Sequence, residues 1–324
     1  MQNTQISAHS LTETSNLLDQ TGPCIVHLAD MTLDHGPGEH GAFLLTGAQT
    51  DDRVTASYCE VDINAGPPPH AHANAEEIFV IQSGAFELLV NGELVVAKAG
   101  DVAYMARGEA HRFRGLDNGE ANTFNVIVAP SGFENFLTRW YPLFENGAPS
   151  MEDAIRLTSE HDITLYPSDD ATPPVPANPQ TKVIRGDQQP ELSVMGARVK
   201  VLLSAQDTEG CYGMVRVEGP RDFGPPVHIH EHEDEMFIVE TGQVEFTLDE
   251  EIVVAEKGDM VWAPRGYAHT FRLRSDDARI LAFITPGGVE EFFVECDRLE
   301  ASGEATLSAL IDLNAKFGMT FPAH

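Results

Sequence analysis

Six histidines and two glutamates recur in this sequence as two sets with the same spacing, a pattern typical of metal ligands. The first set is His70, His72, Glu77 and His111, and the second is His228, His230, Glu235 and His269. Neutral imidazole and one carboxylate together accept iron, manganese, nickel, cobalt or copper. Four protein ligands on an octahedral ion leave two positions for water, dioxygen or a chelating substrate. The sequence therefore predicts one divalent transition metal site per repeat.

Two neighbouring acids compete with the glutamates of these sets. Glu76 stands beside Glu77, and Glu233 lies two positions before Glu235. Only Glu77 and Glu235 are followed, after six residues, by a glycine that both copies share, so they are preferred. His232 is expected to be a solvated loop residue and not a further ligand.

The spacing of the ligands indicates the elements that must hold them. His70 and His72 are two positions apart, so on a strand both imidazoles face the same side. Glu77 is an odd number of positions further on, which requires a turn or bulge between them. His111 must come from a later strand, so the first site is expected to draw on three strands.

The two sets belong to a longer internal repeat. The differences 228 − 70, 235 − 77 and 269 − 111 all equal 158, and similar segments at 132–136 and 288–292 follow at 288 − 132 = 156. A mainly helical stretch follows each of these segments. Residues 168–182 are proline-rich and lack periodicity, which is typical of an extended linker. The sequence predicts an N-terminal domain over 1–175 and a C-terminal domain over 176–324.

Inside each repeat the pattern is that of β-strands. Asn91-Gly92 separates two apolar runs over 87–96, which predicts a hairpin, and 245–254 is its counterpart. Gly-Asp pairs at 100–101 and 258–259 mark turns before further strands. With 27 glycines and 20 prolines, the chain favours many short strands in a sandwich or barrel.

The motif order resembles that of the cupin superfamily: HxHx4Ex6G, then Gly-Asp, then ProxGlyxxHis. The first copy departs from the family at Ala106, where proline is usual, and Gly115 and Leu273 replace the usual terminal asparagine. These departures affect turns and not ligands. The resemblance implies an all-β fold of two tandem double-stranded β-helix (jelly-roll) barrels, each with a short C-terminal helical tail.

Within the superfamily the chain looks most like the bicupin flavonol dioxygenases of the quercetin 2,3-dioxygenase type, on the segments that follow each barrel. Bicupin oxalate decarboxylases usually carry a tryptophan beside the first histidines, and gentisate-type dioxygenases usually lack the motif glutamate. The resemblance implies a metal-dependent dioxygenase that cleaves a flavonol-like or enolizable substrate with O2, releasing carbon monoxide if the substrate is a flavonol. Glu77 or Glu235 would take the proton of the substrate hydroxyl.

Four phenylalanines are expected to face the barrel interiors, by their parity with the predicted ligands. They are Phe79, Phe113, Phe237 and Phe271. Core packing is their ordinary role, and the walls of a site for a flat aromatic substrate are the functional alternative.

Two other functions remain open at this point. One is an oxygen-independent isomerase, lyase or decarboxylase that acts on a small acid or a sugar-derived substrate. The other is a non-catalytic binding or storage bicupin.

Composition restricts the partners. Lys and Arg total 20 against 51 Asp and Glu, a formal net charge of −31, which disfavours nucleic acid and anionic membranes. The four cysteines form no CxxC pair and are expected to be free thiols in a reducing compartment. Residues 1–18 are polar, unlike a secretion signal. We therefore expect a cytoplasmic monomer or homodimer whose partners are a small-molecule substrate and O2.

Overall fold

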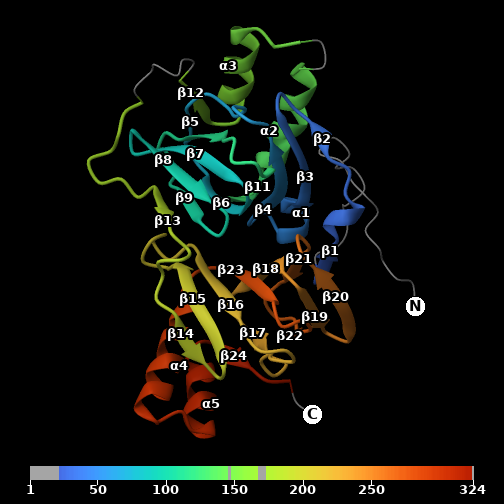
Figure 1. The fold of residues 1–324 in the computed structure, drawn as a ribbon, viewed down its shortest axis with the longest axis vertical. Helices are drawn as coiled ribbons and strands as arrows, with labels where there is room; N and C mark the ends of the chain where they lie inside the picture. Colours follow the sequence, from blue (N-terminus) through green and yellow to red (C-terminus); the bar gives the residue numbers. More distant parts are fainter. Residues whose placement is uncertain (1–21, 145–146, 167–172, 323–324) are drawn as a thin grey trace. The chain divides into compact units, whose positions relative to one another are not determined.

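The computed structural model describes residues 22–144, 147–166 and 173–322, which fall into two compact units (Figure 1). The first unit comprises Asp30–Asp187, and the second combines Gly22–Ala29 with Gln188–His324. The division lies at residues 187–188, further along the chain than the predicted boundary at 175, and a short N-terminal segment joins the second unit. The predicted polar segment 1–18 and part of the predicted linker (168–172) lie outside the described residues.

The first unit is built mainly of short strands, as its turn-rich sequence predicts. Its strands are β2 (Asp34–His35), β3 (Glu39–Leu45), β4 (Thr55–Val61), β5 (His70–His72), β6 (Glu76–Ser83), β7 (Ala85–Val90), β8 (Glu93–Lys98), β9 (Val102–Met105), β10 (Arg112–Gly115), β11 (Asn122–Ala129), β12 (Ile163–Leu165) and β13 (Lys182–Ile184). Its helices are α1 (Gly47–Thr50), α2 (Phe133–Trp140) and α3 (Met151–Glu160).

These strands form two antiparallel layers. One sheet has the order β13-β9-β6-β11-β4-β3-β2, and the opposite layer contains β10-β7-β8 and the pair β12-β5. A bridge between His70 and His111 joins β5 to the start of β10. The buried side chains of both layers make one core, which includes Phe79, Phe113 and Phe124. The layers therefore enclose a barrel, and two ligand histidines lie where its smaller sheets meet.

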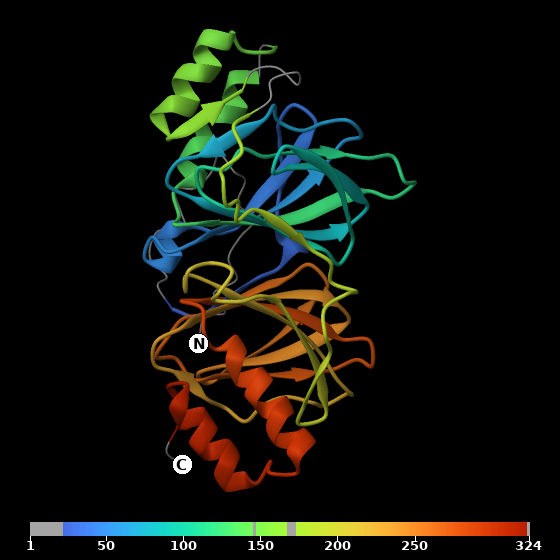
Figure 2. The same cartoon turned by 90° about the vertical axis from the view of Figure 1, so that its left-hand side faces the viewer.

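The second unit repeats this arrangement. Its strands are β1 (Cys24–Val26), β14 (Leu192–Val194), β15 (Ala197–Leu203), β16 (Gly213–Glu218), β17 (Ile229–His230), β18 (Asp234–Thr241), β19 (Gln243–Leu248), β20 (Glu251–Glu256), β21 (Met260–Ala263), β22 (His269–Leu273), β23 (Arg279–Thr285) and β24 (Met319–Thr320). Its helices are α4 (Glu290–Ser302) and α5 (Leu307–Lys316), which lie against one end of its barrel (Figure 2).

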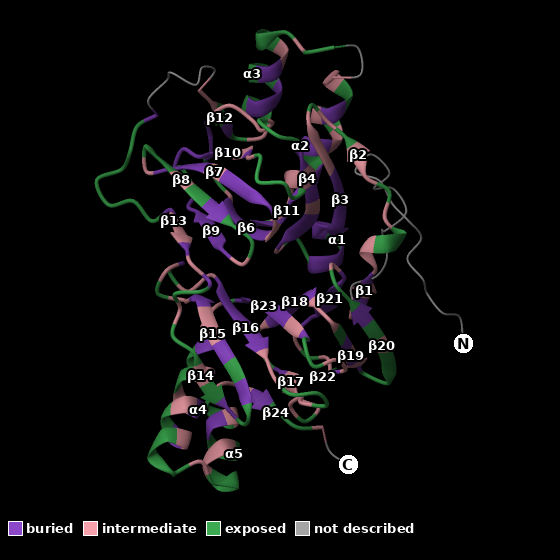
Figure 3. Cartoon of the chain, viewed as in Figure 1, coloured by how far each residue is buried: buried purple, intermediate pink, exposed green. Residues whose placement is uncertain are grey.

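The sheet order of the second unit matches that of the first, strand for strand. The large sheet runs β1-β21-β18-β23-β16-β15-β14, and the other strands form β20-β19-β22 and β17-β24. The interior strands are largely buried, whereas β8 and β20 are mostly exposed (Figure 3). The prediction of two all-β barrels with short helical tails is confirmed.

Each large sheet ends in a strand that comes from a distant part of the chain. In the second unit β1 pairs with β21, and in the first unit β13 pairs with β9. The aspartate of each Gly-Asp turn anchors the incoming segment. Asp259 Oδ2 lies 2.8 Å from His27 Nδ1, and Asp101 Oδ2 accepts a 2.6 Å hydrogen bond from Arg185. The segment that precedes the first unit thus joins the second unit, and the segment that precedes the rest of the second unit joins the first, which we call the strand exchange. Sequence patterns did not reveal this exchange, because a three-residue edge strand carries too little periodicity.

The predicted hairpin is present, as the tight turn between β7 and β8. Asn91 and Gly92 have φ angles of 55° and 79°, the left-handed values that a two-residue hairpin turn requires. Among the described residues, no helix is long and apolar enough to cross a membrane.

Candidate metal centres

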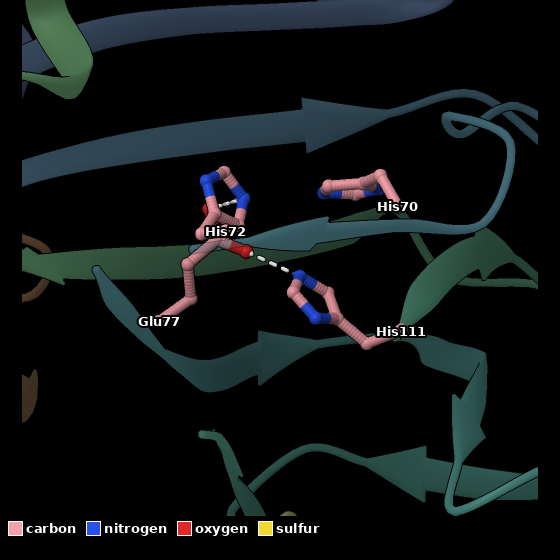
Figure 4. A group of neighbouring side chains, drawn as sticks. All are labelled: His70, His72, Glu77 and His111. Atoms are coloured by element: carbon pink, nitrogen blue, oxygen red, sulfur yellow. Dashed lines mark hydrogen bonds and ion pairs between the residues drawn. The ribbon is translucent and has the colours of Figure 1, made fainter. Parts of the chain in front are cut away.

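The structure brings together the first predicted ligand set inside the barrel of the first unit (Figure 4). His70, His72, Glu77 and His111 each offer one ligand atom, and these atoms lie within 4.8 Å of one another. The Nε2 atom of His111 lies 2.9 Å from Glu77 Oε2, and Nε2 of His72 lies 3.4 Å from Glu77 Oε1. All four residues are buried.

Backbone pairing places these side chains. The amides of His70 and His111 each donate to the other's carbonyl oxygen, at 2.9 and 2.8 Å, so the two residues stand directly opposite on neighbouring strands. His70 Nδ1 lies 3.1 Å from Pro68 O and His111 Nδ1 lies 3.0 Å from Glu109 O, which leaves each Nε2 facing the centre. The chain turns at 73–75 before β6, and this turn brings Glu77 to the same centre.

The charges of the first cluster suit a cation. Burial would raise the pKa of Glu77, but His72 and His111 outweigh it and hold that pKa at about 2. Burial and the neighbouring imidazoles of His111 and His72 lower the pKa of His70 to about 3. The cluster therefore combines a neutral imidazole with an ionised carboxylate, the forms in which these groups bind metals. Nε2 of His72 is buried without a hydrogen-bond partner, so its lone pair is available to an ion.

The second cluster has the same construction. His228, His230, Glu235 and His269 offer ligand atoms that lie within 4.8 Å of one another. Glu235 Oε2 lies 2.8 Å from His269 Nε2 and 3.3 Å from His230 Nε2. Burial opposes the ionisation of Glu235, but His230 and His269 keep its pKa well below the usual range.

The competing acids lie outside both clusters. Glu76 accepts a 2.9 Å hydrogen bond from Arg107, so it points to a different neighbour from Glu77. Glu233 instead faces the outer nitrogen of a histidine, with its Oε2 3.6 Å from His230 Nδ1. Burial alone would lower the pKa of His230, but the carboxylates of Glu235 and Glu233 outweigh burial and raise this pKa to about 9. His232 is exposed, as expected for a loop residue.

A small cavity of about 80 Å³ adjoins the first cluster. Phe79 and Phe113 line it, as their parity predicts, together with Phe133 and Trp140 of α2. A cavity needs about 10–15 Å³ to hold a single water molecule, so this cavity has room for several waters or a small ligand.

A larger cavity of about 290 Å³ adjoins the second cluster. Phe237 and Phe271 line it, as predicted, and α4 and α5 close it with further apolar side chains. Its other apolar wall residues include Phe223, Phe292, Phe293, Leu310 and Met319. Apart from His228, His230 and Glu235, the one polar side chain on its wall is Asn314 among the described residues. This cavity therefore suits a mostly apolar molecule.

Sequence reasoning missed Glu39, an ionisable group of the first cavity. Glu39, at the start of β3, lines this cavity together with Glu77. Burial, reinforced by the charge of Glu77, raises the pKa of Glu39 to about 7. The signal was available in the alternation of β3, since Phe43 lies on the same side of the strand and packs into the core beneath α2. No strand was predicted there, so the alternation was not considered.

The geometry of both clusters fits a metal ion with three imidazoles and one carboxylate. In both clusters buried imidazole nitrogens and a carboxylate converge, and a cavity opens beside each cluster. Such an arrangement can polarise a bound hydroxyl or carbonyl group and present it to a second reactant.

Comparison with known proteins agrees with this fold. The family model described as "Cupin domain" matches twice, at residues 57–127 and 215–284, one match in each unit. Quercetin 2,3-dioxygenase of Bacillus subtilis (strain 168) is 22% identical over 289 residues, which cover 81% of this chain and 84% of that protein.

The similar solved structures include variants of the oxalate decarboxylase of Bacillus subtilis. A variant with tyrosine in place of a tryptophan has a TM-score of 0.61 at 14% identity and covers 92% of this chain and 89% of its own. A variant with alanine in place of a serine has a TM-score of 0.59 at 14% identity and covers 81% and 77%. At this identity the likeness concerns the fold alone. The chain therefore contains two cupin domains, one in each unit, and each unit has one His/Glu cluster that could hold a metal ion.

Proposed function

We propose that this chain is a metal-dependent dioxygenase that cleaves a flavonol-like or enolizable substrate with O2, and that the second unit is where it does so. The observation that carries this proposal is the aromatic and aliphatic cavity of about 290 Å³ beside His228, His230, Glu235 and His269. Its small-molecule substrate and O2 are the partners that the reaction needs.

The size and lining of the two cavities favour the second unit. A tricyclic flavonol needs a cavity close to the lower end of the usual range for ligand pockets, about 300 Å³. The cavity of the second unit is of this size, whereas that of the first is about 80 Å³. Phe237 and Phe271 present ring faces and edges on which a flat substrate can pack.

The residues of the second unit have distinct tasks in this proposal. His228, His230, Glu235 and His269 would hold the ion, which when bound supplies Lewis acidity and a place for dioxygen beside the substrate. Glu235, ionised and inside the cavity, accepts the proton of the substrate hydroxyl. The apolar wall excludes water from the activated substrate. Glu77 would be the corresponding base of the first unit, for a substrate small enough to enter its cavity.

A second candidate function concerns the first unit. Its small cavity carries the polar side chains of Glu39 and Tyr141 in addition to the cluster, which favours a small polar substrate. An oxygen-independent isomerase, lyase or decarboxylase acting on a small acid or sugar-derived substrate fits this cavity better than a flavonol does.

Oxygen uptake tests the main proposal. Protein reconstituted separately with iron, manganese, nickel, cobalt and copper is supplied with quercetin. We expect oxygen consumption matched by flavonol loss and carbon monoxide release with at least one metal. Absence of uptake at confirmed metal occupancy would contradict the dioxygenase proposal, and turnover of a small acid without oxygen would support the second candidate.

A further inference from the structure

The two cavities differ most in the polar groups that face them. Glu39, Cys59 and Tyr141 line the cavity of the first unit, in addition to its cluster. The equivalent positions on the strands of the second unit are apolar, namely Ala197 for Glu39 and Val217 for Cys59. The first cavity therefore contains a carboxyl group and a phenol that the second cavity lacks.

Strand register establishes these equivalences. On β3, Gly41 pairs with Cys59 and His40 pairs with Glu60. On β15, Val199 pairs with Val217 and Arg198 pairs with Glu218. Both pairs differ by the same 158 positions as the ligand sets, for example 217 − 59 = 158. One residue before His40 is Glu39, and one residue before Arg198 is Ala197.

The side chains of Glu39 and Tyr141 both line the first cavity, and the ring of Tyr141 also packs in the core beneath α2. Among the described residues, no hydrogen bond joins either the carboxyl group of Glu39 or the hydroxyl of Tyr141 to another side chain. Tyr141 is only 5% exposed, so solvent reaches little of it outside the cavity. Neither polar group is a fully buried atom without a partner, so a ligand in the cavity can reach both and replace water as their hydrogen-bond partner.

The protonation of the two groups makes them complementary in hydrogen bonding. Burial, together with the charge of Glu39, holds the pKa of Tyr141 well above its usual range, so the phenol is a neutral donor. The Glu39 carboxyl on the same cavity wall offers acceptor oxygens in either protonation state. A ligand hydroxyl both donates and accepts, and it satisfies such a pair.

We propose that the first cavity is a separate binding site for a small hydroxylated chelator, whose outer hydroxyl donates to Glu39 and accepts from Tyr141. Its chelating oxygens face His70, His72, Glu77 and His111. This inference rests on metal binding by the first cluster and not on the flavonol reaction of the second unit. Glu39 is thus a specificity-determining residue.

Two matched probes test the proposal. Kojic acid is a hydroxypyranone chelator with a hydroxymethyl group, and allomaltol is the same molecule with a methyl group in its place. Binding is followed by the visible absorption of cobalt(II) in a full-length protein whose second cluster is removed by His230→Ala and His269→Ala. The reciprocal protein, with His72→Ala and His111→Ala, reports on the second unit.

In the protein with only the first cluster, we expect kojic acid to bind about tenfold to a hundredfold more tightly than allomaltol, as for a charge-assisted hydrogen bond. Glu39→Ala, which copies Ala197, should abolish this preference, and Glu39→Gln should retain part of it. Tyr141→Phe should reduce the preference severalfold. Glu60→Gln is the matched control, because Glu60 accepts a hydrogen bond from Tyr58 outside the cavity, and it should preserve the preference.

Three results would overturn the proposal. They are equal binding of the two probes in the parent protein, an unchanged preference in Glu39→Ala, and a preference of the same size in the protein with only the second cluster. Failure of cobalt(II) to bind the first cluster would overturn both this proposal and metal binding there. A melting temperature in Glu39→Ala that is no lower than that of the parent separates lost recognition from lost folding.

Discussion

The Nδ1 atom of His230 lies 3.6 Å from Glu233 Oε2, whereas the corresponding position in the first unit is Ala75. Both atoms are buried without a hydrogen-bond partner, so a small movement would join them. A carboxylate on the outer nitrogen of a metal-binding histidine orients the ring and makes it a better ligand. The two clusters thus share the same four ligands, three histidines and one glutamate, but differ in the residues that support these ligands.

Glu233→Gln should therefore weaken metal binding at the second cluster by about tenfold to a hundredfold. Calorimetric titration with manganese, in protein that lacks the first cluster, measures this affinity. The exposed neighbour Glu231→Gln is the control and should leave it unchanged. Equal affinities in Glu233→Gln and the parent would show that the carboxylate does not support the ion.

The two clusters should load independently. We expect two ions per chain in the parent protein, and one ion per chain after either His111→Ala or His269→Ala. Elemental analysis of dialysed protein measures this count. A chain that loses both ions after one substitution would contradict two separate sites.

Substitution of the proposed base should lower flavonol turnover when it is made in the second unit and not when it is made in the first. Glu235→Gln should lower flavonol turnover by about a hundredfold to ten-thousandfold, the range for general base catalysis. Glu77→Gln should have little effect on flavonol turnover, because the first cavity is too small for a flavonol. Oxygen uptake is measured together with metal content, so that a lost ion is recognised. Full turnover in the double variant would rule out both carboxylates as the base.

The raised pKa of Glu39 predicts how its substitution changes stability with pH. Its pKa is about 7 in the folded protein, against 4.5 for an ordinary exposed glutamate. Between these values the unfolded chain has lost the proton that the folded protein keeps, so the folded protein is progressively destabilised as pH rises. Above pH 7 this cost is constant, and below pH 4.5 it vanishes.

In metal-free protein, Glu39→Gln should therefore be more stable than the parent, by a margin that grows from about pH 5 to about pH 7. Thermal unfolding at several pH values measures the margin. The other ionisable groups of the cavity, His70, His72, Glu77, Cys59 and Tyr141, are present in both proteins. A margin that is constant over this range would contradict the raised pKa.

A buried ion pair in the second unit should be far more sensitive to substitution than an exposed one. Arg216 donates to both oxygens of Glu240, at 2.6 and 2.7 Å, with both side chains buried. Glu240→Ala leaves Arg216 charged and buried, which should cost about 3–5 kcal/mol in the free energy of unfolding. The exposed pair between Arg198 and Glu218 is the control, and Arg198→Ala should cost less than about 1 kcal/mol. Urea unfolding measures both, and similar costs would contradict the prediction.

The repeat made most of the fold and both clusters predictable. A register of 158 positions carried the ligand types, the glycine that follows each motif glutamate and the Gly-Asp turns together, so each copy supported the interpretation of the other. The positions of Glu39 beside the first cavity and of Glu233 beside His230 were not predicted, for the same reason. The other copy has Ala197 and Ala75 at these positions, so a comparison of the two repeats does not single out either glutamate.

The exchanged strands were not predictable because their partners are remote. The three residues of β1 resemble an ordinary short apolar run, and only the tertiary pairing with β21 assigns them to the second unit. The predicted linker had the right composition, but β13 follows it and still belongs to the first unit. Composition identifies an extended segment, but it does not show on which side of that segment a domain ends.

The exchange also has a consequence for synthesis on the ribosome. His27, next to β1, is separated from its partner Asp259 by 232 positions. At about 5–20 residues per second, translation takes on the order of ten seconds or more to cover that distance. Throughout this time the first unit can fold around its own strands while β1 has no sheet to join. A nascent chain that stalls before β21 therefore exposes an early apolar strand to other molecules, and completion of the second unit depends on a segment made long before the rest of it.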